Sequence, residues 1–346
     1  MNETSRIDRL RSSLEEPLLV TSGFNLFYLC GFHSSNAALL VDDDRVRLFS
    51  DFRYAEAARA VEGVEFIEAP RNLFEGLARA LSGRIGFEDL HVSYAQYATL
   101  AEAGLELVPR RGLVEGLRAV KDDGELELMR KAAAVTSEVF DRLAGEGFIG
   151  KTEKELVWRI AEVFQESGAD AVAFTIVATG PAGAVPHAEP GERVVEPGHT
   201  VVVDAGCRIG SYCSDCTRTF AAGSLGEELA GAYAACREAQ EAGLEAVRAG
   251  VTGRDADAAA REVIERAGFG KAFGHGLGHG LGLEVHEAPV LRPESEDVLG
   301  VRNVVTVEPG IYLSGRGGIR IEDSVVVTEN DAEILTTATK ELVSVN

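Results

Sequence analysis

Residues 274–289 read GHGLGHGLGLEVHEAP and contain three of the seven histidines of the chain, His275, His279 and His286, among five glycines. Glycine lets the backbone approach a metal ion or a ligand closely. The stretch does not match the phosphate-binding pattern G-x-G-x-x-G, and the zinc-protease pattern H-E-x-x-H does not occur in the chain. The alternative to a functional role is that these histidines lie in the core and bond to backbone groups. The grouping of three histidines in one glycine-rich segment favours a functional site, more for His279 and His286 than for His275.

Four acidic residues in the second half of the chain lie within or directly after apolar runs. They are Asp204, Asp215, Glu308 and Glu322. A buried carboxylate without a partner is costly, and Arg218 and Arg320 are the nearby candidates for neutralising one or two of them. Four such groups would raise one another's pKa, whereas four carboxylates and one histidine, with two carboxylates bridging, match the ligand count for two divalent cations. An oxygen-rich set favours Mn or Co, with Fe and Zn as alternatives.

Sequence spacing supports two pairs within this set. Residues 207–210 (CRIG) between Asp204 and Asp215 predict a turn that places these two residues on adjacent strands. Residues 314–318 (SGRGG) predict the same for Glu308 and Glu322. Alternation along 318–323 (GIRIED) places Arg320 on the same face as Glu322, where it would contact a ligand carboxylate.

Composition limits the class of protein. The chain has 346 residues, 45% of them hydrophobic, which predicts a soluble protein of two domains. A net charge of −22 argues against a nucleic-acid partner, and no apolar run approaches the ~18 residues that a membrane span needs. The polar first ten residues do not resemble a secretory signal. The chain has five cysteines, and this odd number argues against a disulfide framework. We therefore expect a cytoplasmic protein. The C-x-x-C pair Cys213 and Cys216 is expected to pack as small apolar residues rather than to bind zinc.

The pattern of short apolar runs changes between residues 115 and 122. Residues 1–115 alternate strands and helices, including a hairpin of 37–41 and 45–50, and predict an α/β domain with an architectural role. From Asp122, a plausible N-cap, we expect helices over 122–147 and over 151–168, the second with a capping box of Thr152 and Glu155. Strands over 172–179, 200–206 and 216–223, helices over 226–250 and 253–268, and strands over 281–287, 303–313 and 318–329 are expected to follow.

Five motifs occur in order through the second half of the chain. They are VVVDAG (201–206), YCSDCTRTF (212–220), GHGLGHGLGLEVHEAP (274–289), TVEPGIYL (306–313) and GIRIEDSVVV (318–327). They resemble the motifs of the Xaa-Pro peptidases, the aminopeptidase P and prolidase group of dinuclear metallopeptidases. NLFYLCGF (25–32) and RLFSDFRYAEAARA (47–60) are similar to the amino-terminal domain of that group. The resemblance implies an α/β (α+β) fold class: a creatinase-like mixed α/β domain over 1–115, then a pita-bread catalytic domain over 122–346.

The resemblance also implies roles for individual residues. The implied metal ligands are Asp204, Asp215, His279, Glu308 and Glu322. His279 rather than His275 matches the ligand histidine by its separation from Glu308. The implied catalytic residues are His187, His286 and Glu308, and the implied substrate-pocket residues are His275, Tyr312 and Arg320. His187 and His286 would hold the substrate and its tetrahedral intermediate.

The implied activity is that of a Xaa-Pro aminopeptidase, in which a metal-bridged hydroxide releases the residue before proline. Its partners would be peptides with proline at the second position and a second copy of the chain. A Xaa-Pro dipeptidase and a non-catalytic binding protein on the same fold are the alternatives. A dipeptidase must bind a free carboxylate, ordinarily with an arginine. Val290 stands where some prolidases carry that arginine and Arg292 follows two places on, which favours the aminopeptidase slightly.

Overall fold

The computed structural model describes residues 5–346, which divide after Arg118 into an N-terminal and a C-terminal compact unit. Each unit has its own hydrophobic core. The units are described separately below. None of the helices among residues 5–346 is long and apolar enough to cross a bilayer.

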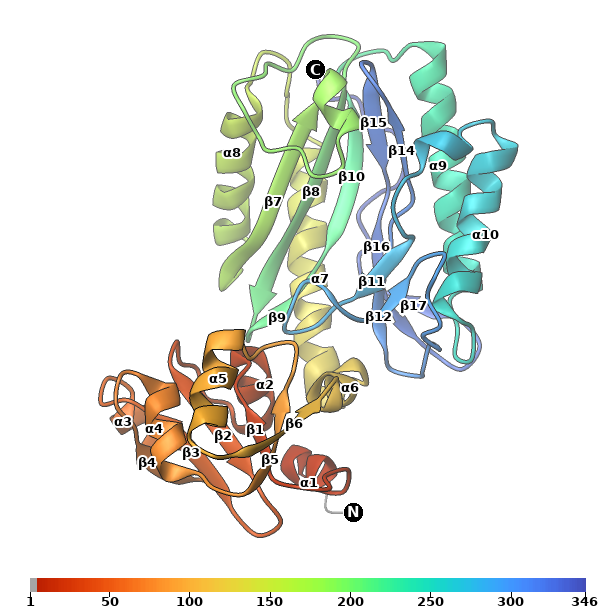
Figure 1. Ribbon diagram of the computed structural model, residues 1–346. Helices are drawn as coiled ribbons and strands as arrows, with labels where there is room; N and C mark the ends of the chain where they lie inside the picture. The colour runs from red at the N-terminus through yellow and green to blue at the C-terminus, as the bar shows by residue number, and fades with distance from the viewer. Residues whose placement is uncertain (1–4) are drawn as a thin grey trace. The chain divides into compact units, whose positions relative to one another are not determined.

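The N-terminal unit is built on one six-stranded sheet in the order β4-β3-β2-β1-β5-β6 (Figure 1). The predicted hairpin is confirmed as β2 and β3, which pair antiparallel, and the backbone N–H of Asp42 donates to the carbonyl of Arg45 at 3.0 Å to close the turn. β1 with β5, β5 with β6 and β3 with β4 pair in parallel, so the sheet is mixed. The elements are α1 (Arg6–Arg11), β1 (Leu18–Val20), α2 (Gly23–Cys30), β2 (Ala37–Val41), β3 (Val46–Ser50), α3 (Ala55–Arg59), β4 (Glu65–Glu68), α4 (Leu73–Ala80), β5 (Arg84–Glu88), α5 (Tyr94–Glu102), β6 (Glu106–Arg110) and α6 (Leu113–Ala119).

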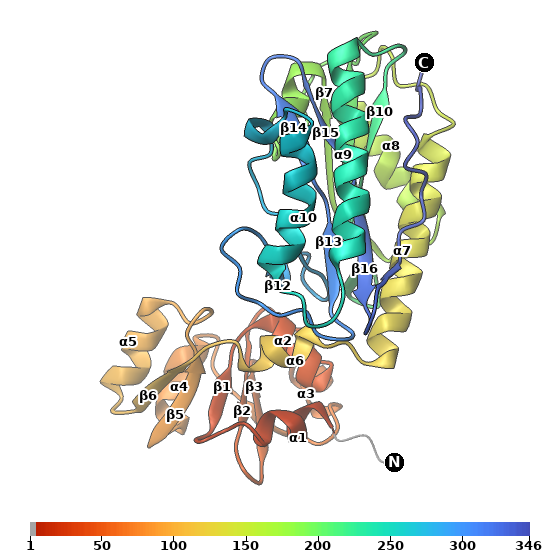
Figure 2. The same ribbon diagram turned by 90° about the vertical axis from the view of Figure 1, so that its right-hand side faces the viewer.

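The C-terminal unit contains two larger sheets, each covered by a pair of long helices on one face, and one two-stranded sheet (Figures 1 and 2). α7 and α8 pack on the sheet β10-β8-β7, and α9 and α10 pack on β12-β11-β13-β16-β17 and on the hairpin β14-β15. The elements of the first half are α7 (Asp123–Leu143), α8 (Glu153–Glu166), β7 (Ala171–Thr179), the 3₁₀ turn η1 (Gly180–Ala184), β8 (Thr200–Ile209), β9 (Tyr212–Cys213) and β10 (Cys216–Ala221). Those of the second half are α9 (Glu227–Ala246), α10 (Gly253–Arg266), the 3₁₀ turn η2 (Gly270–Ala272), β11 (Gly278–Gly280), β12 (Glu287–Leu291), β13 (Val304–Val307), β14 (Gly310–Leu313), β15 (Gly317–Arg320), β16 (Asp323–Val327) and β17 (Ala332–Ile334).

The expected helix starts are confirmed. Asp122 caps α7 and Thr152 caps α8, and each side chain accepts a hydrogen bond from the backbone N–H of a glutamate three residues on, Glu125 and Glu155. Both glutamates bond back to the N–H of the cap residue. These reciprocal bonds satisfy N–H groups that a helix leaves open at its start.

Strand alternation separates the residues that face the helices from those that face the centre of the unit. On β8, Val201, Val203 and Ala205 belong to the core under α7 and α8, so Asp204 points to the opposite face. Along β15 and the two residues that follow it, Ile319 and Ile321 belong to the core under α9 and α10. Arg320 and Glu322 therefore share the face away from the helices, as the sequence predicts.

Three expectations about strands are wrong in detail. The predicted strand over 281–287 is a compact loop, because the Glu287 carboxylate accepts the backbone N–H of Glu284 at 3.0 Å and lies against Gly282. Its alternating pattern only imitates a strand. The predicted strands over 303–313 and 318–329 each break in two, at residues 308–309 and 321–322.

The turn between β8 and β9 lies at Gly210 and Ser211 rather than across 207–210. Both residues have positive φ, 55° and 75°, as a two-residue hairpin turn requires. Cys207 and Arg208 remain in β8. All five cysteines are free thiols, and Cys213 and Cys216 are fully buried in the sheet.

Candidate metal centre

A cavity of about 530 Å³ lies within the C-terminal unit, where the uncovered faces of its two sheets meet. Every residue that the sequence predicts as a metal ligand lines it. So do His187, His275, His286 and Arg320, whereas Tyr312 is absent from the lining and bonds to two of the residues in it.

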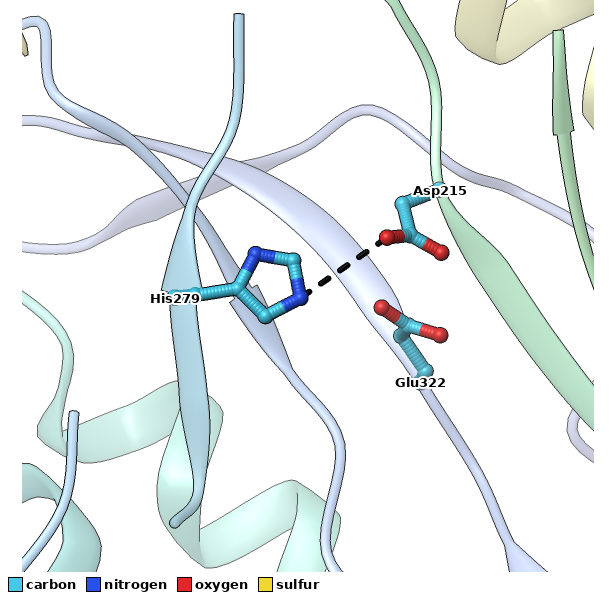
Figure 3. Close-up of side chains that lie close together, drawn as sticks. All are labelled: Asp215, His279 and Glu322. Atoms are coloured by element: carbon cyan, nitrogen blue, oxygen red, sulfur yellow. Dashed lines mark ion pairs between the residues drawn. The ribbon is translucent and has the colours of Figure 1, made fainter. Parts of the chain in front are cut away.

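Asp215, His279 and Glu322 form the centre of this cluster, with one possible ligand atom from each within 4.8 Å of the others (Figure 3). Asp215 directly precedes β10, His279 lies in β11, and Glu322 lies between β15 and β16. The hydroxyl of Thr217 donates to Glu322 Oε2 at 2.6 Å and fixes that carboxylate against β10. Three segments far apart in sequence thus bring their polar ends together.

Asp204 and Glu308 border this centre. Asp204 pairs with Thr217 across β8 and β10, and its Oδ2 bonds to Arg320 Nη2 at 2.5 Å. Glu308 follows β13, and its Oε1 lies 3.1 Å from His279 Nε2. The predicted ligand set is therefore gathered in one place.

Ion pairing neutralises the cluster only in part. Arg218 bonds to Asp323 at 2.7 Å and so serves the neighbouring carboxylate, while Arg320 serves Asp204. Within residues 5–346, no lysine or arginine lies within ion-pairing distance of Asp215 or Glu322. Burial, and then repulsion from the other carboxylates, raises the pKa of both groups well above the ordinary value. Repulsion of this kind is relieved by a cation among the carboxylates.

The donor atoms fit divalent cations. Asp204 Oδ1 and Glu322 Oε1 are buried and have no hydrogen-bond partner within the described chain, although buried polar atoms are nearly always bonded. The Nδ1 of His279 lies 3.1 Å from the carbonyl of Gly280, which makes Nδ1 the donor and turns Nε2 toward the carboxylates, where a cation could bind in place of a proton. Carboxylate oxygens and one imidazole nitrogen are suitable ligands for Mn, Co, Fe or Zn.

His279 and Glu308 carry opposite pKa shifts. Burial alone would lower the pKa of His279, but the hydrogen bond and the charge of Glu308 raise it to about 9. Burial alone would raise the pKa of Glu308, but the hydrogen bond and charge of His279 lower it to about 2. The pair is therefore ionic near neutral pH, and a cation bound at Nε2 would replace the proton there.

Addition of Mn²⁺ to chelator-treated protein is expected to raise the midpoint of thermal unfolding. A cation that binds only the folded state adds about 2.7 kcal/mol when its free concentration is a hundred times its Kd. Differential scanning calorimetry would measure the shift, with KCl at equal ionic strength as the control. An equal response to KCl would mean that general screening, rather than a site, stabilises the protein.

His275 is held by a chain of hydrogen bonds. Its Nδ1 lies 2.7 Å from the carbonyl of Gly276 and its Nε2 lies 2.8 Å from the hydroxyl of Tyr312. Because Nδ1 donates to the carbonyl, Nε2 of the neutral ring accepts from the phenol, whose oxygen in turn accepts from Arg320 Nη1 at 2.9 Å. Both nitrogens of His275 are thus used within the protein, and burial lowers its pKa. His275 is therefore better suited to form a wall of the cavity than to donate a hydrogen bond to a substrate.

His187 and His286 differ from His275 in this respect. Both are exposed at the cavity, and neither forms a hydrogen bond with any of residues 5–346. Partial burial and the neighbouring His279, with ring centroids 4.3 Å apart, lower the pKa of His286. Their ring nitrogens are free to contact a ligand.

The apolar wall of the cavity could not be identified from the sequence. Phe174, Ile176, Pro186 and Val285 line it, and Ile176 is the cross-strand partner of Asp204. The alternation of 172–179 predicted a strand but could not indicate which of its faces lies toward the carboxylates. Arg292, noted in the sequence for another reason, also lines the cavity.

Comparison with known families agrees with this architecture. Residues 127–329 match the model of metallopeptidase family M24, and residues 6–120 match the creatinase/prolidase N-terminal domain. The protein belongs to metallopeptidase family M24, in the group of Xaa-Pro peptidases with this N-terminal domain. The expected mixed α/β fold with a pita-bread catalytic domain is confirmed.

Several relatives are similar over almost the whole chain. The Xaa-Pro dipeptidase of Pyrococcus furiosus is 32% identical, covering 97% of this chain and 99% of its own. The solved structure of a Xaa-Pro dipeptidase from Bacillus anthracis has a TM-score of 0.93 at 36% identity, covering 98% of each chain. That of an X-Pro aminopeptidase from Thermotoga maritima has a TM-score of 0.88 at 34% identity, covering 99% of this chain and 100% of its own.

Proposed function

We propose that this protein is a metal-dependent Xaa-Pro dipeptidase, the alternative to the aminopeptidase that the sequence analysis placed first. The observation that carries the choice is the position of Arg292. It lines the same cavity as the predicted ligands, is exposed there, and its guanidinium group has no ion-pair or hydrogen-bond partner among residues 5–346. Relatives named Xaa-Pro dipeptidase, from Pyrococcus furiosus and Bacillus anthracis, support the same choice.

The charges of the cavity suit a dipeptide. The carboxylate cluster would attract the free amino group of a substrate, and Arg292 would bind the free carboxylate of its second residue. A dipeptide is the only peptide whose two terminal charges are separated by a single peptide bond. A cavity of about 530 Å³ is suited to a small ligand of this kind.

The residues around the scissile bond would act as follows. Divalent cations held by the five predicted ligands would polarise the attacking water and the carbonyl group. Glu308 would accept a proton, and the N–H groups of His286 and His187 would donate to the oxygen that becomes negative. Arg320 would hold Asp204 in place through their hydrogen bond.

The aminopeptidase remains the second candidate because of Val290, which gives the position directly after Pro289 no positive charge. The X-Pro aminopeptidase of Thermotoga maritima is also similar over the whole chain. Hydrolysis of Gly-Pro, Gly-Pro amide and Arg-Pro-Pro with Mn²⁺ present separates the two. A dipeptidase should cleave Gly-Pro fastest, whereas faster cleavage of Arg-Pro-Pro would establish the aminopeptidase instead. No turnover of any of the three would exclude both.

Replacement of Arg292 by Met is expected to raise KM for Gly-Pro by about 10–100-fold, the factor that corresponds to one charge-assisted hydrogen bond. KM for Gly-Pro amide, which lacks the carboxylate, should change little. The control is Arg266→Met on α10, which removes another exposed arginine outside the cavity. An equal rise in KM for both substrates would refute the assigned role of Arg292.

A further inference from the structure

The loop that carries Pro186 and His187 leaves β7 after Thr179 and returns along the start of α8 (Figure 1). Its returning part is docked by backbone bonds. The N–H of Glu153 donates to the carbonyl of Arg193 at 3.0 Å, and the N–H of Lys154 donates to that of Gly191 at 3.2 Å. These bonds satisfy N–H groups in the first turn of α8, so the helix start and the loop form one unit.

The side chain of Glu153 joins the two ends of this loop. Its carboxylate is completely buried. Oε1 accepts the N–H of Thr179, before the loop, at 2.9 Å, and Oε2 accepts the N–H of Gly191, after His187, at 2.7 Å. One carboxylate therefore closes the base of the segment 180–190.

Arg193 provides the counter-charge for Glu153. Its Nε lies 2.9 Å from Glu153 Oε1 and its Nη2 lies 2.6 Å from Oε2. Nη2 also donates to the carbonyl of Glu189 at 2.7 Å. The ion pair thus connects Glu153 to the backbone of Glu189, two residues after His187.

The middle of the loop has further anchors. The carbonyl of Pro186 accepts a hydrogen bond from Arg320 Nη1 at 3.4 Å. The backbone of Gly183 packs against Gly318, where an added Cβ on Gly318 would lie 1.8 Å from the carbonyl oxygen of Gly183. The side chain of His187 itself forms no hydrogen bond within the described chain, so its position depends on these backbone contacts.

We propose that Glu153 is a positioning residue for the reaction: by clamping both ends of the loop 180–190, it holds His187 at the cavity. Glu153 does not line the cavity and acts through the loop. The kinetic part of this inference rests on the proposed peptidase function, whereas its structural part does not.

The chain offers a matched control. Glu155, two residues on, forms the capping box with Thr152 and has no hydrogen bond to the loop. Glu153→Gln and Glu155→Gln make the same chemical change at the same helix start. An amide can accept through one atom only, so in Glu153→Gln it must direct an NH₂ group at the N–H of Thr179 or of Gly191. Glu155→Gln leaves both loop contacts intact.

Hydrogen exchange measured by mass spectrometry tests whether Glu153 holds the loop, and this measurement does not depend on enzymatic activity. Amides of the segment 179–191 should exchange faster in Glu153→Gln than in the wild type and in Glu155→Gln. Unchanged exchange in this segment would overturn the proposal. If Glu153→Gln does not fold, Arg193→Met removes the ion pair but keeps the two backbone bonds, and faster exchange in the same segment is again expected.

Kinetics then test whether the clamp acts through His187. The value of kcat/KM for the cleaved peptide should fall by about 10–100-fold in Glu153→Gln, as a displacement of roughly 1 Å near the reaction can cause, and by less than about 2-fold in Glu155→Gln. In a His187→Ala background, Glu153→Gln should add little further loss. Additive losses would overturn the role of Glu153 as a positioning residue for His187. A wild-type protein that cleaves no peptide would refute the proposed function, and the exchange result would still decide the clamp.

Discussion

Asp215→Asn is expected to abolish metal-dependent peptide hydrolysis. Removal of a residue that only contacts a metal ligand costs about 10–100-fold in metal affinity or activity, and the loss of a central ligand should exceed that. Asp215 lies with His279 and Glu322 at the centre of the cluster, and an amide would remove one charge and one oxygen donor from it. Steady-state rates at saturating Mn²⁺, together with metal content per chain, would measure the effect.

Asp170→Asn provides the control for this variant. Asp170 accepts the backbone N–H of Gly210 at 2.7 Å at an exposed turn outside the cavity. We expect it to retain metal and activity. If Asp215→Asn kept both as well, the assignment of Asp215 as a ligand would be wrong, and the account of the carboxylate cluster would have to change.

Gly278→Ala is expected to destabilise the fold by about 3 kcal/mol or more, because a methyl group must enter an already filled space. A Cβ on Gly278 would lie 1.9 Å from the carbonyl oxygen of Thr306 on β13. That atom is part of the backbone and cannot rotate away, so β11 and β13 must separate. His279 follows directly on β11 and Glu308 follows shortly after Thr306, so their contact at 3.1 Å should also be lost.

Gly274→Ala makes the same change in the same glycine-rich segment, where an added Cβ would meet nothing within 4 Å. Its free energy of unfolding should stay within about 0.5 kcal/mol of the wild-type value. Denaturant titration of both variants would provide the comparison. Equal midpoints for Gly278→Ala and the wild type would show that close approach of the backbone does not explain the glycine at 278.

The lack of space around the glycines explains why glycine and histidine alternate in residues 274–289. Gly276, Gly278, Gly280 and Gly282 each lie where a Cβ would come within 3.0 Å of another atom, whereas Gly274 does not. The segment is glycine-rich because β11 lies against β13 on one side and the chain around β12 on the other. Histidine side chains can then project from a backbone that is itself tightly packed.

Much of the fold was predictable because its signals are local. The caps Asp122 and Thr152 act on N–H groups within one helical turn, and the hairpin of β2 and β3 closes over a few residues. The signal for the carboxylate cluster was also local. An acidic residue within an apolar run indicates a buried carboxylate that needs a partner, whatever the rest of the fold is. The prediction over 281–287 was wrong because the side chain of Glu287 bonds back to its own loop, which alternation of polar and apolar residues cannot indicate.

The residue types that could form a cation site, and their order along the chain, were enough to predict that such a site exists. The three-dimensional structure established which side chains are paired: Arg218 with Asp323, Arg320 with Asp204, and His275 with Tyr312. It also placed Arg292 at the cavity and Glu153 beneath the loop of His187. The physical reason is that backbone propensity depends on near neighbours, whereas hydrogen bonds and charges act between atoms that only folding brings within a few ångströms.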